Sequence, residues 1–273
     1  MVGSVTQLRL QTVQLHPAQE WTIAYSRWCA FRIIDGQGFW LARNEQRALG
    51  PGDIGLARPS ARGTIRASQL SRLTVAFFFF APALLETILS ISEERFFQAQ
   101  ESDEAKDAYF MDSNHPAAQQ FARVCDAPAG NNFVLRGEML ATIGRVFATE
   151  LTVAPPVGTE GLVCSKRIRH FLNELTTAEV LRLTPEGIAA LCRCRPRQFS
   201  ILFKGKLGRS FATLKKEIRL LRARDLLAEP GSDIDAIARE AGYETTGAFT
   251  AMFQKQFSIK PAQWREAAAK LKD

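Results

Sequence analysis

The stretch IAREAGYETTGAFTAMFQKQFSIKPAQWR, residues 237–265, decides the fold of the C-terminal part of this chain. Ile237 and Ala238 predict the buried face of a short helix, and Gly242 follows where a residue with positive φ lets the chain reverse. Phe249 and Phe253 come one helical turn apart, which predicts a second helix held against the first by aromatic side chains. A short helix, a tight turn and a second helix in this order form a helix-turn-helix unit.

The same pattern occurs 50 residues earlier, in IAALCRCRPRQFSILFKGKLG, residues 188–208, with Phe199 and Phe203 as its aromatic pair. Helix-start signals precede both units, as an N-cap residue or a first-turn proline. They are Thr184 and Pro185 for the first unit and Ser232 or Asp233 for the second. Aromatic pairs at this spacing are core residues in most helices, so the duplication itself carries the prediction of two units.

A single long helix is predicted between the two units, over residues 211–227. Leu214, Ile218 and Leu221 place apolar side chains on one of its faces. At about 1.5 Å per residue the helix spans about 25 Å. It can therefore hold two DNA-reading helices approximately one turn of the duplex apart, about 34 Å.

Positive charge is concentrated in the C-terminal part of the chain. Residues 162–273 hold 21 Lys and Arg against 12 Asp and Glu, whereas the remaining residues carry a net charge of −2 within the total of +7. A basic domain joined to a near-neutral one favours a polyanionic partner for the basic domain. A basic face that is merely solvated is the alternative explanation.

Residues 162–268 resemble the AraC/XylS family of transcription regulators. The matching positions are Ile237, Ala238, Gly242, Tyr243, Phe249, Phe253, Phe257, Pro261, Trp264 and Arg265 in the second unit, and Ile188, Ala189, Phe199, Phe203, Gly208, Phe211, Leu220, Arg222, Ala223 and Leu227 in the first. Three residues depart from the family pattern: Gly247 replaces Ser, Ser258 replaces Gly, and Trp264 replaces Tyr or Phe. None of these removes a core hydrophobic residue, so the fold that the resemblance implies is retained.

The resemblance implies base contacts from the outward positions of each recognition helix, the first of which begins near Pro196. The candidate DNA-binding residues are Arg195, Arg197, Gln198, Ser200, Ile201 and Lys204 in the first unit, and Thr246, Gly247, Thr250, Ala251, Gln254 and Lys255 in the second. Arg197 can make two hydrogen bonds to guanine, and Ile201 can pack on a thymine methyl group. The first four residues of the second set are short and poor in donors, so we expect the first unit to discriminate sequence. The second unit then adds phosphate contacts from Gln254, Lys255 and nearby backbone. Each arginine has the alternative of being a solvated surface charge.

Short strands are predicted over about residues 8–80, with hairpins at residues 32–42 and 46–57. Helical spacing follows at residues 117–124 and 135–151, and the second of these stripes can pair across a two-fold axis or pack on its own domain. The expected fold is α+β with two domains: a cupin-like β-barrel with trailing helices, and an all-α domain with two helix-turn-helix units. The expected boundaries are residues 1–152 for the barrel, 153–161 for a Pro- and Gly-containing linker, and 162–273 for the DNA-binding domain.

Aromatic residues in the first strands suggest an apolar ligand pocket in the barrel. Trp21 and Trp40 are the candidate ligand contacts, with Arg32 or Arg43 available for an anionic group. The alternative is that these aromatic side chains only fill the barrel. The three histidines lie far apart in the sequence and Cys192-x-Cys194 has no second ligand pair nearby, so we expect no metal and no cofactor.

An enzyme is not expected, because the chain shows no nucleophile motif, paired carboxylates or metal cluster. Five cysteines without framework spacing and the lack of a signal peptide favour a cytoplasmic protein, and the longest apolar run is too short to cross a membrane. We expect a homodimeric transcription regulator that binds double-stranded DNA and is controlled by a small molecule, with RNA polymerase as a further partner if it is an activator. The alternative is an effector-independent regulator whose N-terminal domain serves dimerisation or partner-protein contact.

Overall fold

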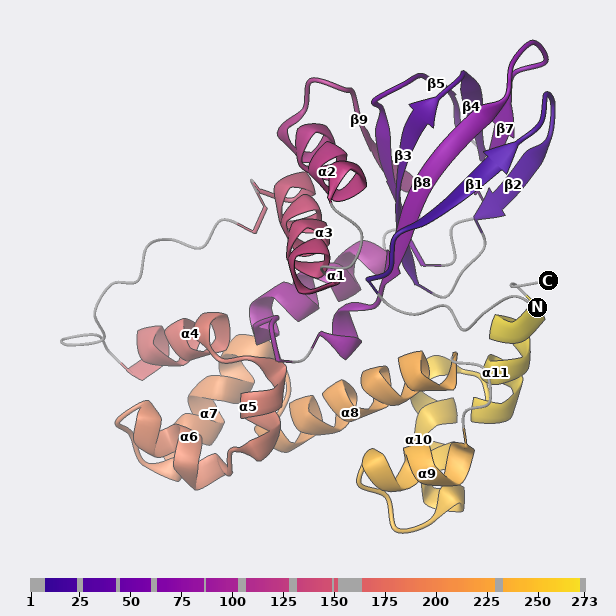
Figure 1. Cartoon of the computed structure of the whole chain (residues 1–273). Helices are drawn as coiled ribbons and strands as arrows, with labels where there is room; N and C mark the ends of the chain where they lie inside the picture. The colour runs from indigo at the N-terminus through magenta and orange to yellow at the C-terminus, as the bar shows by residue number, and fades with distance from the viewer. Residues whose placement is uncertain are drawn as a thin grey trace. The chain divides into compact units, whose positions relative to one another are not determined.

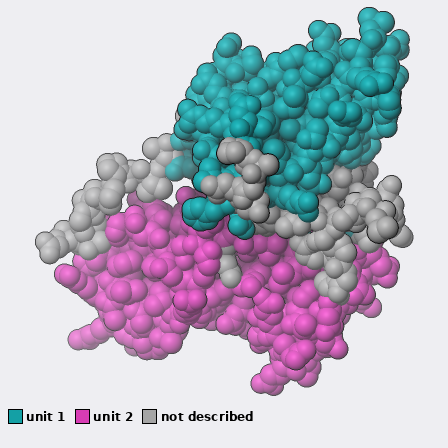
Figure 2. All heavy atoms as spheres, viewed as in Figure 1, with its two compact units in different colours: residues 1–81, 100–152, 268–273 teal, residues 82–99, 153–267 magenta. Residues whose placement is uncertain are grey.

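The computed structural model describes residues 8–23, 27–42, 45–59, 63–85, 87–102, 107–127, 132–148, 150–151, 164–228 and 233–270. The chain forms two compact units, shown in different colours in Figure 2. Unit 1 comprises residues 1–81, 100–152 and 268–273, and unit 2 comprises residues 82–99 and 153–267. The expected linker at residues 153–161 lies outside the described residues.

Unit 1 is built on two antiparallel sheets (Figure 1). The five-stranded sheet has the order β1 (Gln11–Leu15), β8 (Leu73–Phe80), β3 (Trp28–Asp35), β6 (Ile54–Ala57) and β9 (Ala108–Met111). The four-stranded sheet has the order β2 (Glu20–Ile23), β7 (Gly63–Ala67), β4 (Gly38–Ala42) and β5 (Glu45–Leu49). The α+β fold class is confirmed, with two separate sheets in place of a single closed barrel.

The two hairpins predicted from sequence are wrong, although the strands themselves are present. β3 pairs with β6 and β8, whereas β4 pairs with β5 and β7, so residues 32–42 pass from one sheet to the other. The same holds for residues 46–57, which connect β5 to β6 across the sheets. Glycines with positive φ, Gly36 at 86° and Gly52 at 91°, lie in the two connections and allow the chain to turn there.

The apolar run in β8 is explained by burial on both faces of the strand. Phe77 and Phe79 belong to the cluster of buried side chains shared by the two sheets. Phe78 and Phe80 point to the opposite face, where Phe78 packs against Phe121 with ring centroids 5.3 Å apart. A strand covered on both faces has no polar alternation, as the sequence of β8 shows.

Two helices of unit 1, α2 (Pro116–Asp126) and α3 (Asn132–Val146), pack against each other next to the five-stranded sheet (Figure 1). Both were expected from their apolar spacing, although α3 ends at Val146 and not at residue 151. Met139 and Ile143 of α3 are 0% and 5% exposed, so this stripe packs within unit 1.

Unit 2 is helical (Figure 1). It contains η1 (Pro82–Leu84), α1 (Ile91–Ser102), α4 (Cys164–Glu174), α5 (Thr177–Arg182), α6 (Pro185–Leu191), α7 (Pro196–Leu207), α8 (Phe211–Leu227), α9 (Ile234–Glu240), α10 (Thr246–Phe257) and α11 (Pro261–Lys270), with the ends of α1 and α11 grouped with unit 1. Across the described residues, none of the helices has the length and apolar character needed to cross a membrane.

Candidate nucleic-acid interface

The first helix-turn-helix unit consists of α6, a tight turn and α7. The Thr184 side chain accepts a hydrogen bond from the Gly187 N–H and Pro185 occupies the first turn, so α6 begins where the sequence predicted. At the end of α6 the Arg193 N–H donates to the Ala190 carbonyl at 2.9 Å. The Cys194 N–H donates to the Ala189 carbonyl at 3.0 Å, which closes the turn ahead of α7.

The second unit, α9, a turn and α10, reproduces these contacts. The Gly242 N–H donates to the Arg239 carbonyl at 2.9 Å and the Tyr243 N–H donates to the Ala238 carbonyl at 3.0 Å. The Asp233 side chain caps α9, as expected from sequence. The internal repeat in the sequence is therefore a repeat of backbone geometry.

The tight turn of each unit needs one residue in the left-handed region. Gly242 meets this need in the second unit with φ of 81°, whereas Arg193 has φ of 50° in the first. A residue with a Cβ atom is strained in this region and glycine is not. The C-caps of α7 and α10 reverse the assignment, because Gly208 has φ of 70° and Ser258 has φ of 60°.

Aromatic side chains hold each recognition helix, α7 or α10, against the rest of its unit. Phe199 and Phe203 are 0% exposed and both meet Phe211 of α8 edge-on, with ring centroids 5.8 and 5.6 Å apart. Phe249 and Phe253 are equally buried in the second unit. α8 belongs to both cores and has 17 residues, a length of about 25 Å.

All candidate residues of the first recognition helix are solvent-exposed. They are Arg195, Arg197, Gln198, Ser200, Ile201 and Lys204. Ile201 is 65% exposed, which is unusual for an isoleucine and leaves its side chain free to pack on a partner. The Ser200 hydroxyl donates to the Pro196 carbonyl at 3.0 Å, so its oxygen remains available as an acceptor.

The second recognition helix presents a different surface. Gly247, Ala251, Gln254 and Lys255 are exposed, whereas Thr246 and Thr250 are partly buried. The Thr246 hydroxyl donates to Asp235 Oδ1 at 2.6 Å, which ties α10 to the first turn of α9.

The thiols of Cys192 and Cys194, in the tight turn between α6 and α7, are protonated at neutral pH. Burial raises the pKa of Cys192 to about 12, with further increases from the neighbouring Cys194 and Cys164. Burial and a hydrogen bond with Cys164 raise the pKa of Cys194 to about 11. Across the described residues, no group of three or more His, Cys, Asp or Glu side chains is arranged to hold a metal ion.

The two ligand candidates of unit 1 lie in different environments. Trp40 is 0% exposed and stacks on Phe31 with ring centroids 5.9 Å apart. A Cβ atom added to Gly63 would meet the Trp40 ring at 1.8 Å, so the indole lies directly on the backbone of β7. Trp21 is partly buried and packs on Phe77, with ring centroids 4.6 Å apart. The Trp40 indole nitrogen has no hydrogen-bond partner among the described residues.

Sequence reasoning missed two features of unit 2. Arg193 was not recognised as a left-handed residue, although its alignment with Gly242 in the repeat was a usable signal. The helix α1 was not predicted, although Ser90 and Glu93 have the spacing of a capping box, and residues 82–99 are grouped with the DNA-binding helices.

Comparison with known proteins places the similarity in this region. The family described as "Helix-turn-helix domain" matches residues 188–267. The HTH-type transcriptional regulator GlxA of Rhizobium meliloti is 32% identical over 94 residues, which are 34% of this chain and 29% of that protein. The regulatory protein PocR of Salmonella typhimurium is 31% identical over 81 residues, 30% of this chain and 27% of that protein. The matches thus span less than a third of these two relatives.

Two solved structures also align with this chain. ToxT from Vibrio cholerae aligns over 95% of this chain and 98% of its own with 12% identity and a TM-score of 0.39. A transcriptional regulator from Chromobacterium violaceum, described as AraC-type DNA-binding domain-containing, is 31% identical over 32% of this chain and 79% of its own, with a TM-score of 0.30. From the repeated geometry and the matched residues, we conclude that the C-terminal part of this chain is a double helix-turn-helix domain, which resembles that of the AraC/XylS family.

Proposed function

We propose that this protein is a transcription regulator that binds double-stranded DNA in a sequence-specific manner. The observation that carries the proposal is the repeated helix-turn-helix geometry, with α7 and α10 joined through α8. A connector of about 25 Å suits two helices that enter successive major grooves about 34 Å apart. The net positive charge of residues 162–273 supports a polyanionic partner.

The two units have unequal roles in this proposal. In α7, Arg197 and its exposed neighbours offer guanidinium and hydroxyl groups for hydrogen bonds to base edges. In α10, the exposed Gly247 and Ala251 offer no side-chain donor, and the Thr246 hydroxyl already donates to Asp235. The first unit therefore reads sequence, and the second anchors the protein through Gln254, Lys255 and backbone N–H groups.

Selection of bound duplexes from a random pool tests this function, followed by titration of the Arg197→Ala variant. We expect Arg197→Ala to weaken the binding free energy for the selected duplex by about 1–3 kcal/mol and to relax the preference at one base pair. Arg123→Ala is the matched control, because Arg123 is an exposed arginine on α2 of unit 1. An equal loss of affinity for selected and random duplexes would show that Arg197 contacts phosphate and not bases.

A small-molecule effector bound in unit 1 is the second part of the proposal. Its support is the aromatic cluster between the two sheets, together with the indole N–H of Trp40, which is unpaired within the described residues and could donate to a ligand. Trp21 lies at the edge of this cluster and is the more accessible of the two tryptophans. The alternative is an effector-independent regulator whose N-terminal part serves dimerisation or partner-protein contact.

A thermal-shift screen of metabolites separates these alternatives. A binder that raises the melting temperature of the wild type and changes its DNA affinity supports a sensor, and Trp21→Ala should weaken that shift. A metabolite collection that leaves both quantities unchanged favours the effector-independent alternative.

The remaining parts of the proposal concern organisation. The protein acts in the cytoplasm as a homodimer, with residues 1–152 as the sensor and dimerisation domain, residues 153–161 as the linker and residues 162–273 as the DNA-binding domain. Within the first of these ranges, residues 82–99 group with unit 2. RNA polymerase is a further partner if the protein activates transcription.

A further inference from the structure

Residues 82–99 are part of unit 2, although the chain on either side of them belongs to unit 1. This segment contains η1 and most of α1, and it follows β8 and precedes β9 in the sequence. The segment is therefore covalently continuous with strands of unit 1 at both ends.

The backbone of this segment is joined to the chain that leads into α5. Ser90 and Thr176 form an antiparallel bridge. The Ile91 N–H donates to the Leu175 carbonyl at 3.3 Å, and the Thr177 N–H donates to the Leu89 carbonyl at 3.2 Å.

Side chains of α1 also enter the core of the first helix-turn-helix unit. Ile91 is 1% exposed and belongs to the cluster that contains Phe199 and Phe203 of α7. The Ser92 hydroxyl donates to Asn173 Oδ1 of α4 at 2.5 Å. The core cluster that buries Phe199 and Phe203 of α7 therefore includes a residue from the segment that connects two strands of unit 1.

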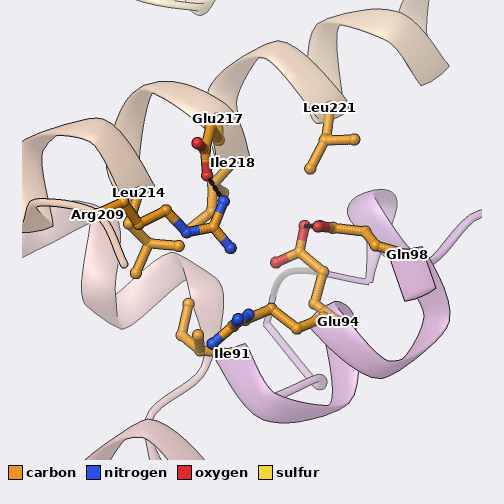
Figure 3. A pocket seen from close by; sticks show the side chains of 9 residues that line it. Ile91, Glu94, Gln98, Arg209, Leu214, Glu217, Ile218 and Leu221 are labelled. Atoms are coloured by element: carbon orange, nitrogen blue, oxygen red, sulfur yellow. Dashed lines mark hydrogen bonds and ion pairs between the residues drawn. The ribbon is translucent and has the colours of Figure 1, made fainter. Parts of the chain in front are cut away.

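A charged cluster places α1 against the joint between α7 and α8. Figure 3 shows the Glu94 carboxylate and the Arg209 guanidinium directed into a small recess between α1 and α8, with a volume of about 10 Å³. Arg209 forms an ion pair with Glu217, and Glu94 accepts a hydrogen bond from Gln98 at 3.4 Å. Arg209 lies between Gly208, the C-cap of α7, and the residue that caps α8, so its position bears on the angle between these helices.

One buried atom of this cluster, the Arg209 Nε, has no hydrogen-bond partner among the described residues. The Glu94 carboxylate on the other side of the recess is also buried, at 2% exposed. Burial lowers the pKa of Arg209, and the nearby Arg95 lowers it further while Glu94 opposes this. Partly satisfied buried polar groups make a contact specific in geometry but costly to maintain, which suits a contact with two alternative states.

We propose that residues 82–99 form a coupling segment through which unit 1 controls the DNA affinity of unit 2. In this proposal, which rests on the DNA-binding function proposed above, the docked α1 fixes the joint between the recognition helix α7 and α8. A ligand or partner that shifts the strands on either side of the segment changes the docking of α1 and so the affinity for DNA. Linkage requires the reverse effect as well, so bound DNA must stabilise the docked α1.

Hydrogen exchange of the full-length protein tests this reverse effect, with and without a duplex selected from a random pool. We expect the duplex to slow exchange in α7 and also in residues 88–98. Ser92→Ala removes the hydrogen bond to Asn173 and should reduce the protection of residues 88–98. It should also weaken DNA binding about fivefold, the lower end of typical coupling between sites.

A matched pair of core variants separates coupling from general loss of stability. Ile91→Ala and Ile168→Ala each remove the same atoms from the same cluster, at positions that are both 1% exposed. Both should destabilise unit 2 to a similar extent. Only Ile91→Ala, in α1, should abolish the slowing of exchange that DNA produces in residues 88–98.

The outcomes are distinguishable. If the duplex protects α7 and leaves residues 88–98 unchanged, the coupling is wrong and the DNA-binding function stands. The coupling is also wrong if Ile168→Ala abolishes the response of residues 88–98 as fully as Ile91→Ala does. If the protein selects no duplex and α7 does not respond, the DNA-binding function itself fails and the coupling fails with it.

Discussion

At the scale of single residues, the two tight turns differ in how well their sequence suits their backbone. Arg193 and Gly242 adopt positive φ at corresponding positions, and only the glycine does so without strain. The left-handed conformation costs a residue with a Cβ atom about 1–2 kcal/mol. The first unit, proposed to read DNA, is therefore the one whose turn is strained.

Exchanging the residue types at these two positions should have opposite effects on stability. Arg193→Gly should raise the free energy of unfolding of unit 2 by about 1 kcal/mol, because it removes the left-handed strain. Gly242→Ala should lower it by about 1–2 kcal/mol, and its Cβ would lie 3.1 Å from the Arg219 Nη1 atom. Urea dependence of amide exchange in α6 and α9 measures both changes.

Arg193→Ala is the control for the first substitution, since it removes the charge and keeps the strain. It should stay within about 0.5 kcal/mol of the wild type, as exposed substitutions usually do. A gain in stability equal to that of Arg193→Gly would trace the effect to the charge and contradict the explanation by backbone strain.

At the scale of elements, helix caps set where the helices of unit 2 begin, and one of them is sensitive to pH. The Glu179 carboxylate accepts hydrogen bonds from the Thr176 N–H and hydroxyl, each at 2.8 Å, at the start of α5. The backbone hydrogen bond, followed by that from the hydroxyl, lowers the pKa of Glu179. A carboxyl with a lowered pKa in the folded state stabilises the fold above its unfolded pKa of about 4.3 and ceases to do so in more acidic solution.

The stabilisation by Glu179 should therefore disappear as the pH falls. Glu179→Gln keeps the shape of the capping box and removes the charge. Wild type should be the more stable of the two at neutral pH, and the difference should shrink from about pH 5 downward. Thermal unfolding of both proteins across this range measures the difference, and a gap that is independent of pH would contradict the assignment. Glu179→Ala should remain less stable than wild type even in acid, because it lacks the side chain that closes the box.

Trp264, which departs from the family pattern, connects α11 to α8 by a hydrogen bond. The Trp264 indole N–H donates to the Arg224 carbonyl of α8 at 3.1 Å, a bond that a phenylalanine cannot make. Trp264→Phe should lower the free energy of unfolding of unit 2 by about 0.5–1.5 kcal/mol. Urea unfolding followed by amide exchange in α11 measures this loss, and an unchanged protection would show that the bond contributes nothing.

At the scale of the whole molecule, burial within unit 1 decides which face of α3 can form the proposed dimer. The α3 stripe that includes Met139 and Ile143 is buried within unit 1 and is not free to pair. The opposite face carries Phe133, which is 83% exposed, and the glycines 137 and 144, where an added Cβ would meet no described atom within 4 Å. This outward face is the part of α3 left for a second copy.

We expect Phe133→Glu to convert a dimer into a monomer without loss of stability. The physical reason is that the substitution adds a charge to a surface that only a second copy would bury. Light scattering measures the mass, and the melting temperature reports stability. Met139→Asp is the contrasting variant, which should unfold unit 1 because it buries an unpaired charge. A Phe133→Glu protein that remains dimeric would exclude this face of α3.

The sequence by itself determined the helix-turn-helix units, because their signals are local. Each unit is indicated by an aromatic pair one helical turn apart, a helix cap and a residue at the turn, all close together in the sequence. The aromatic pair recurs at a spacing of 50 residues, so the pattern could be recognised in two places. The strands of unit 1 were visible for the same reason, since alternation of side chains is a property of each strand alone.

Only the tertiary structure decided which strands pair and where α1 docks. Gly36 and Gly52 mark turns in the sequence, but a turn does not state whether the next strand joins the same sheet or the facing one. Likewise, nothing in the sequence around Ile91 indicates that it joins a core cluster with residues of α4 and α7, which follow it by more than 70 residues. Such contacts depend on the free energy of packing together surfaces that are far apart in the sequence. A sequence pattern within one segment does not encode this free energy.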